Sequence, residues 1–188
     1  MLKNAVDYLL NEVLTTAAEY ENAEKALSMA YNKDKTPAAW EAAARDAKRR
    51  AAQLAITLDG LADRSFSELG ISKNAVRKKV SKLCSWPTTG GDRNGAYNRV
   101  RAVANAYKHS TLSDPTLPIT SENDILVVGL GYGRDGYGVG KPGFPEVIVK
   151  ETNGAEYKFL GDALVSIAEW FRFLQTNGAY IPRGPFRA

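Results

Sequence analysis

The chain has 188 residues, with 25 basic and 21 acidic side chains but only one cysteine and one histidine. That length suits one domain, or one domain with a small appendage. The single cysteine excludes an internal disulfide and a zinc site built on several thiolates, and the single histidine excludes multi-histidine metal centres. We therefore expect neither a metal nor another cofactor. Charges near the start of the chain and the lack of a run of about 18 apolar residues predict a soluble, cytoplasmic protein without a signal peptide or membrane span.

The net charge of +4 is unevenly distributed along the chain. Residues 1–44 hold four basic and seven acidic side chains, residues 45–110 hold fourteen and five, and residues 111–188 hold seven and nine, so the net charges are −3, +9 and −2. Such a concentration of positive charge is typical of an anion-binding surface. Solvated helix faces on an ordinary protein can have the same composition.

Two long helices are expected first. Apolar residues recur at spacings of three and four over residues 2–31, which is the pattern of one buried helix face. A second helix is expected to begin at Thr36 and Pro37, because a capping residue followed by proline suits a first helical turn, and to end before Gly70. The connection is short, so the two helices should form an antiparallel hairpin.

Two shorter helices are expected over residues 73–85 and 94–109. Pro87 and the following glycines separate them, and Asp92 or Asn94 is a suitable cap for the second. The sequence therefore predicts a bundle of four helices in the first 112 residues.

Three strands follow, over residues 125–128, 146–150 and 155–160, because each is a short run of β-branched, aromatic or alternating residues. Asn153 and Gly154 separate the last two strands and form a strong hairpin signal. We therefore expect an antiparallel meander.

A final helix is expected over residues 162–176, with Asp162 as its cap and Gly178 just after its end. The predicted fold class is α+β: a helical bundle over residues 1–112, and a meander with a C-terminal helix over residues 113–188. A lone three-stranded sheet is only marginally stable, so the second part should pack on the first as one unit.

A glycine-rich connection spans residues 129–144. Gly131, Gly133 and Gly136 match the spacing of a dinucleotide fingerprint, but Pro142 follows in place of the helix whose N-terminus would hold the pyrophosphate. Long connections of this kind are often functional, so we expect the segment to bind a partner or cover a site. The candidate partner-binding residues are Tyr132, Arg134, Tyr137 and Lys141.

Polar residues form a stripe on the expected helix 94–109. Asn98, Arg101, Asn105 and His109 are spaced three, four and four apart, and Lys108 adjoins them. A histidine can exchange a proton near neutral pH, and arginine or lysine can balance a phosphate charge. The structural interpretation is a polar helix face, with His109 interacting with the helix C-terminus.

The segment Ala104 to His109 resembles the signature of the HEPN superfamily, which is an Arg, commonly followed by Asn, and then a His after four to six residues. Asn105 and His109 match, while Ala104 stands where the family has Arg. Arg101 is the nearest substitute, but seven residues separate it from His109, and the eight helical steps between them rise about 12 Å. The resemblance implies a helical bundle, a metal-independent ribonuclease and a homodimer with its site at the interface. The absence of the family's arginine at Ala104 argues against nuclease activity, whereas RNA binding does not depend on it.

Two functions from different classes fit these observations. The first is RNA binding, as a degenerate or active HEPN-like ribonuclease, with His109 transferring a proton, Asn105 orienting the substrate and Arg101 holding phosphate. Further phosphate contacts are assigned to Lys78, Lys79, Lys82 and Lys108. The second is a non-catalytic protein-interaction module that uses the loop 129–144.

Three other features are interpreted as structural. Cys84 continues the apolar face of helix 73–85, so we expect a buried thiol rather than a nucleophile acting with His109. Asp59 and Asp63 are one helical turn apart without another metal-ligand motif beside them, so we expect a surface pair. The three tryptophans are scattered and should serve packing.

Overall fold

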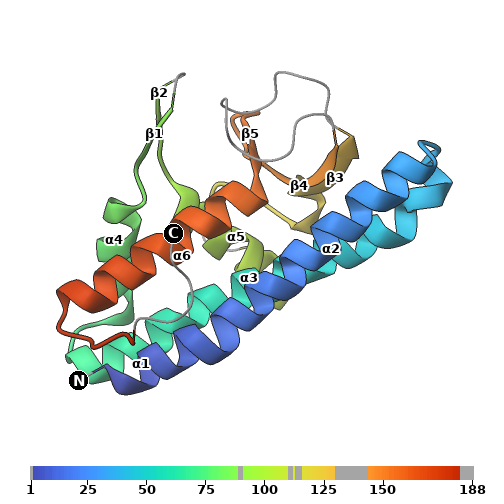
Figure 1. Ribbon diagram of the computed structural model, residues 1–188. Helices are drawn as coiled ribbons and strands as arrows, with labels where there is room; N and C mark the ends of the chain where they lie inside the picture. Colours follow the sequence, from blue (N-terminus) through green and yellow to red (C-terminus); the bar gives the residue numbers. More distant parts are fainter. Residues whose placement is uncertain (1, 89–90, 110–111, 113–115, 130–143, 183–188) are drawn as a thin grey trace.

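The computed structural model describes residues 2–88, 91–109, 112, 116–129 and 144–182. It shows an α+β protein in which helices precede a three-stranded antiparallel sheet and a final helix (Figure 1). The predicted fold class is therefore confirmed.

The two long helices form an antiparallel pair that runs the length of the molecule (Figure 1). The first is a continuous run of α1 (Lys3–Tyr8), the π-helical segment η1 (Leu9–Val13) and α2 (Leu14–Lys33), and the second is α3 (Pro37–Leu69). Thr36 occupies the N-cap position of α3, but its side chain makes no capping hydrogen bond. Gly70 ends α3 in a left-handed conformation, φ 66°, which glycine adopts at little cost.

The shorter helices are α4 (Lys73–Leu83) and α5 (Ala96–Lys108). They are joined by a β-hairpin that the sequence analysis missed, formed by β1 (Trp86–Thr88) and β2 (Gly91–Arg93). The expected caps of α5, Asp92 and Asn94, are wrong, because Gly95 holds that position with φ 76°. A Cβ atom at position 95 would also lie only 3.1 Å from Arg99 Nη1. Glycine therefore suits this position both because of its backbone conformation and because it leaves room for the Arg99 side chain.

The sheet is the expected antiparallel meander. Its strands are β3 (Ile125–Gly129), β4 (Pro145–Lys150) and β5 (Glu156–Lys158), in that order. Asn153 and Gly154 make the turn between the last two strands, where the Asn153 side chain accepts a hydrogen bond from the Ala155 N–H at 2.8 Å and Gly154 has φ 86°. β5 is shorter than predicted because the chain enters α6 (Phe159–Thr176) directly after it.

Asp162 does not cap α6, contrary to expectation, because Lys158 occupies the N-cap position. The Asp162 carboxylate is instead fully buried and accepts hydrogen bonds from Arg99 Nε at 2.7 Å and Nη2 at 2.9 Å. Arg99 also donates to Glu151 at 3.0 Å, and its guanidinium carbon lies 3.6 Å from the centre of the Tyr157 ring. One side chain of α5 thus connects the helical part to the sheet and to α6.

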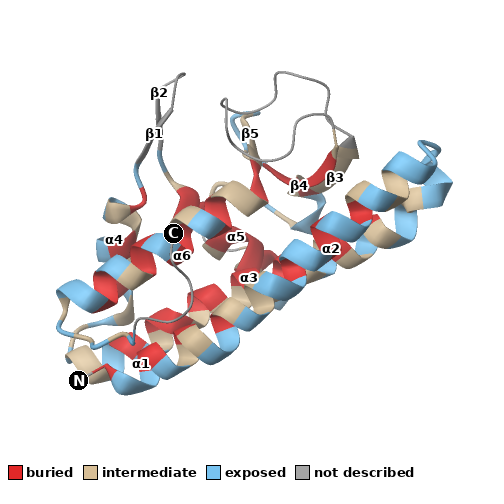
Figure 2. Cartoon of the chain, viewed as in Figure 1, coloured by how far each residue is buried: buried red, intermediate tan, exposed pale blue. Residues whose placement is uncertain are grey.

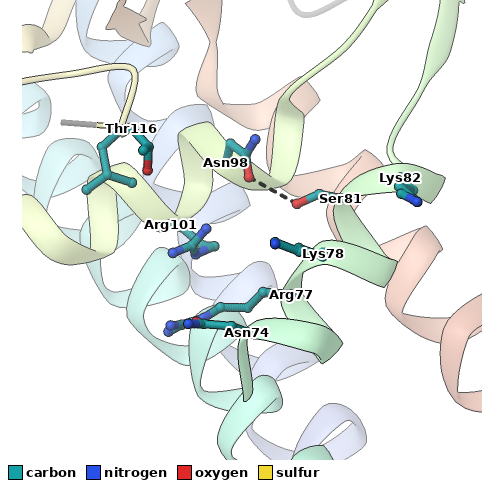
Figure 3. Close-up of a pocket in the computed structure, with 9 residues that line it drawn as sticks. Asn74, Arg77, Lys78, Ser81, Lys82, Asn98, Arg101 and Thr116 are labelled. Carbon is teal, nitrogen blue, oxygen red and sulfur yellow. Dashed lines mark hydrogen bonds between the residues drawn. The ribbon is translucent and has the colours of Figure 1, made fainter. Parts of the chain in front are cut away.

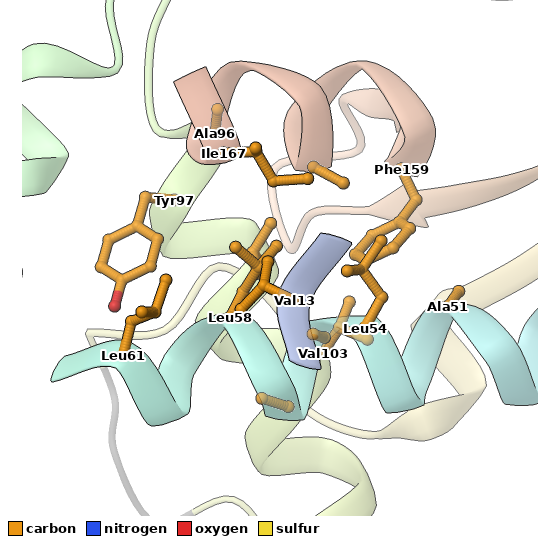
Figure 4. Close-up of a cluster of buried hydrophobic side chains, with 14 of the residues drawn as sticks. Val13, Ala51, Leu54, Leu58, Leu61, Ala96, Tyr97, Val103, Phe159 and Ile167 are labelled. Carbon is orange, nitrogen blue, oxygen red and sulfur yellow. The ribbon is translucent and has the colours of Figure 1, made fainter. Parts of the chain in front are cut away.

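The hydrophobic core lies where α3, α5 and α6 face one another (Figures 2 and 4). Leu54, Leu58 and Leu61 project from α3, and Figure 4 shows them beneath residues of α5 and α6. Tyr97 of α5 meets Trp170 of α6 edge to face, with ring centres 5.8 Å apart. This contact fixes α5, the helix that carries most of the predicted site, between the other two helices.

Replacing Arg99 with alanine is expected to lower the free energy of unfolding by about 3–5 kcal/mol, because it removes the cation from a buried ion cluster and leaves the Asp162 and Glu151 carboxylates without it. The exposed side-chain fractions of Arg99 and Asp162 are only 2% and 0%. Urea unfolding followed by circular dichroism measures the change.

Arg45→Ala is the matched control. Arg45 pairs with Glu41 on the surface of α3, where the two side chains are 68% and 65% exposed, so its removal should cost less than about 1 kcal/mol. Equal losses in the two variants would contradict the assigned role of Arg99.

Candidate functional site

A pocket of about 530 Å³ lies between α4, α5 and the segment after α5, and we call it the α4–α5 pocket (Figure 3). Its polar lining includes Arg77, Lys78, Ser81 and Lys82 of α4 and Asn98 and Arg101 of α5. Four of these side chains are cationic, and none of the described residues that line the pocket is acidic. The pocket is therefore suited to an anion.

The periodicity of α4 explains the cationic lining. Arg77, Lys78 and Lys82 fall on one side of the helix, while Val76 and Val80 on the other side are buried in the core. A hydrogen bond from the Ser81 hydroxyl to Asn98 Oδ1, at 3.0 Å, holds this helix against α5.

Asp59 of α3 supports the cations of the pocket. Its carboxylate is 2% exposed and accepts hydrogen bonds from Arg77 Nε at 3.0 Å and from Arg77 Nη2 at 2.8 and 2.6 Å. Arg101 Nε lies 3.9 Å from it and Lys108 Nζ 3.6 Å from it. One carboxylate thus faces three cations, so the cluster keeps a net positive charge.

The expectation of a surface pair at Asp59 and Asp63 is wrong for Asp59, which is buried. Asp63 forms an ion pair with Lys73. The physical reason is that the cations that pair with Asp59 belong to α4 and α5, which pack against α3 in the folded chain. Sequence spacing within α3 carries no sign of those partners.

Arg101 points toward Lys78 across the α4–α5 pocket (Figure 3). Its Nε atom is buried and has no hydrogen-bond partner among the described residues, because the Asp59 oxygen at 3.9 Å is too distant. Buried donors are almost always satisfied in folded proteins.

A second pocket, of about 410 Å³, lies at the C-terminal end of α5, and we call it the α5-end pocket. Its lining includes Tyr107, Lys108 and His109, together with Ser121, Glu122 and Asn123 from the 3₁₀ turn η2 (Glu122–Asp124) and the residue before it. His109 is exposed and ends α5, where its backbone N–H donates to the Asn105 carbonyl at 3.0 Å.

The predicted catalytic residues are divided between these two places. Arg101 lines the α4–α5 pocket, His109 lines the α5-end pocket, and Asn105 lies between them along α5 without lining either. The length of the helix explains the separation, because eight residues rise about 12 Å. Lys108 lines the pocket of His109 and also reaches Asp59.

The predicted phosphate contacts on α4 are divided as well. Lys78 and Lys82 line the α4–α5 pocket, whereas Lys79 is exposed on a different side of the helix and is not part of the lining. Arg77 was not predicted from the sequence, although it lies four residues before Ser81 and therefore on the same face of α4. The proposed partner-binding residues Tyr132, Arg134, Tyr137 and Lys141 lie outside the described residues.

No family model, no curated protein and no solved structure matches this chain. The resemblance to the HEPN superfamily stays a prediction from Asn105 and His109. Within the described part of the chain, no three His, Cys, Asp or Glu side chains gather closely enough to hold a metal ion. No helix in that part is long and apolar enough to cross a membrane.

Cys84, the C-cap residue that follows α4, is buried, as expected. Burial raises the pKa of its thiol to about 12, and the nearby carboxylate of Glu169 adds to this effect. The thiolate is the reactive form of cysteine, so almost none of the nucleophile is present at neutral pH. Cys84 therefore does not serve as a catalytic nucleophile.

The native protein should react with Ellman's reagent at pH 8 at least a hundred times more slowly than the protein unfolded in guanidinium chloride. The reason is that burial both shields the Cys84 thiol and keeps it protonated. Absorbance of the released thiolate measures the rate. Comparable rates for native and unfolded protein would show that the thiol is accessible and ionised in the fold.

Proposed function

We propose that the protein binds RNA and that the α4–α5 pocket holds backbone phosphate. The observation that carries the proposal is the charge of this pocket: Arg77, Lys78, Lys82 and Arg101 line it, and Asp59 is the carboxylate that Arg77 and Arg101 share. Arginine and lysine facing an open pocket are the groups that proteins use for phosphate oxygens.

The excess of cations supports binding over a purely structural role. A structural ion cluster is most stable when its charges are balanced, since an unbalanced charge near the core costs free energy. Here three cations surround one carboxylate, and Lys78 and Lys82 add two more at the pocket. A bound phosphate would reduce this repulsion.

The HEPN-like ribonuclease is part of the same proposal. In this form His109 transfers a proton and Asn105 orients the substrate, as the resemblance implies. Arg101 and His109 of one chain line different pockets, so cleavage would need His109 to meet groups of a second copy. The homodimer implied by the resemblance would supply that copy, and a cytoplasmic location would supply RNA.

Lys78→Ala and Lys82→Ala are each expected to weaken binding of single-stranded RNA severalfold, and to reduce the slope of log affinity against log salt by about 0.7 per lost phosphate contact. Fluorescence anisotropy with a labelled oligonucleotide over a range of salt concentrations measures both quantities.

Lys79→Ala is the matched control, because it removes the same charge from the same helix outside the pocket. It should change the affinity less than about twofold and leave the slope of log affinity against log salt unchanged. Equal effects of the Lys78 and Lys79 substitutions would indicate diffuse attraction without a site. Absence of RNA binding by the unmodified protein at low salt would overturn the proposal in favour of the protein-interaction alternative that uses the loop 129–144.

His109→Ala is expected to abolish RNA cleavage, if the unmodified protein cleaves, because it removes the proton-transfer group. Cleavage is measured on a gel at saturating protein, so that a change in affinity does not enter the rate. Unchanged cleavage would exclude His109 from the chemistry. Binding without cleavage by the unmodified protein identifies the degenerate, binding form of the proposal.

A further inference from the structure

We infer that the α5-end pocket holds one unpaired nucleobase of the RNA whose phosphates lie in the α4–α5 pocket. This inference rests on the proposed function and adds the substrate class, which is single-stranded RNA. Three features of the molecule support it: the path between the two pockets, the chemistry of the second pocket and the rigidity of its wall.

Lys108 connects the two pockets. It lies seven residues after Arg101, which places the two side chains on the same side of α5 and about 10 Å apart along the helix. Lys108 Nζ reaches the Asp59 carboxylate that also holds Arg77, and the same residue lines the α5-end pocket. A strand bound at Arg101 can therefore follow the cations along α5 into the second pocket.

The lining of the α5-end pocket suits a base better than a second phosphate. Glu122 lines it, and a carboxylate repels a phosphate but accepts hydrogen bonds from the amino and ring N–H groups of bases. Asn123 can donate and accept on a base edge. Burial, together with the charge of Glu122, raises the pKa of Tyr107 to about 12, so its phenol stays neutral. His109 offers a planar ring on which a base can stack.

The wall of this pocket is held in place before any ligand arrives. Asp124 accepts hydrogen bonds from the Thr120 N–H and hydroxyl, both at 2.8 Å, and from the Ser121 N–H at 3.0 Å. Lys48 of α3 donates to the Glu122 carbonyl at 3.1 Å. These bonds use Thr120 and Asp124 internally and leave the Glu122 carboxylate and Asn123 amide exposed as the groups that can recognise a ligand.

Base recognition is tested with short single-stranded RNA homopolymers of adenylate, cytidylate, guanylate and uridylate of equal length, measured by fluorescence anisotropy. Asn123→Ala and Glu122→Gln should change the order of affinity among the four, with a loss of roughly threefold to tenfold for the preferred base. Asn123→Ala removes a donor and an acceptor, and Glu122→Gln replaces one accepting carboxylate oxygen with an NH2 donor that a base N–H cannot bond. Asn22→Ala, which removes an exposed amide from α2, should leave the order unchanged.

Stacking is tested by two substitutions of His109. His109→Ala should weaken binding to all four homopolymers roughly tenfold, whereas His109→Phe, which keeps a planar ring, should restore most of the affinity. The two variants have the same net charge, so a difference between them cannot come from electrostatic attraction.

The outcomes separate this inference from the function on which it rests. If the unmodified protein binds no RNA at low salt, the proposed function fails and the inference fails with it. If RNA binds and Lys78→Ala weakens it, but the Asn123 and His109 variants behave like Asn22→Ala, the inference alone is overturned. A preference for duplex over single-stranded RNA would also overturn it, since a paired base cannot enter the pocket.

Discussion

The buried carboxylate of Asp59 is the interaction on which the candidate site depends. Burying an ion costs several kcal/mol, and this cost is offset only when the ion's partners have good geometry. Arg77 has such geometry, because its Nε and Nη2 atoms donate hydrogen bonds to the two oxygens of the Asp59 carboxylate. The same carboxylate lies near Arg101 and Lys108 of α5. One side chain of α3 therefore positions cations from two other helices. Because these cationic side chains are already oriented, they would lose little conformational entropy when a ligand binds.

The ion clusters around Arg99 and Asp59 differ in their balance of charge. At Arg99, one guanidinium meets two carboxylates, Asp162 and Glu151, deep between α5, the β4–β5 turn and α6. At Asp59, one carboxylate meets three cations next to a pocket. The first arrangement uses all three nitrogens of its guanidinium for hydrogen bonds inside the protein and serves to join elements. The second leaves positive charge facing solvent, which is the property that an anion-binding surface requires.

The sequence was sufficient for elements with strong local patterns. The hydrophobic period predicted the long helices, and Asn153-Gly154 predicted the turn between β4 and β5. Prediction from the sequence failed where the role of a residue depends on partners far along the chain. Asp162 was predicted to cap a helix because the cation that binds it, Arg99, is 63 residues away in the sequence. For the site, the basic composition indicated Lys78, Lys82 and Arg101, but not the buried Asp59. The β1–β2 hairpin was missed because its proline and glycines resemble a loop.

The direction of α5 also distinguishes its two pockets. The last carbonyl groups of a helix carry a partial negative charge, so an anion is disfavoured near the C-terminal end unless a cation offsets it. Lys108 lies in that last turn, but Asp59 already shares its charge, and Glu122 adds a negative charge across the α5-end pocket. Arg101 lies nearly two turns earlier, and although its Nε is also 3.9 Å from Asp59, none of the described residues that line its pocket is acidic. The electrostatics of one helix therefore favour phosphate beside Arg101 and an uncharged group beside His109.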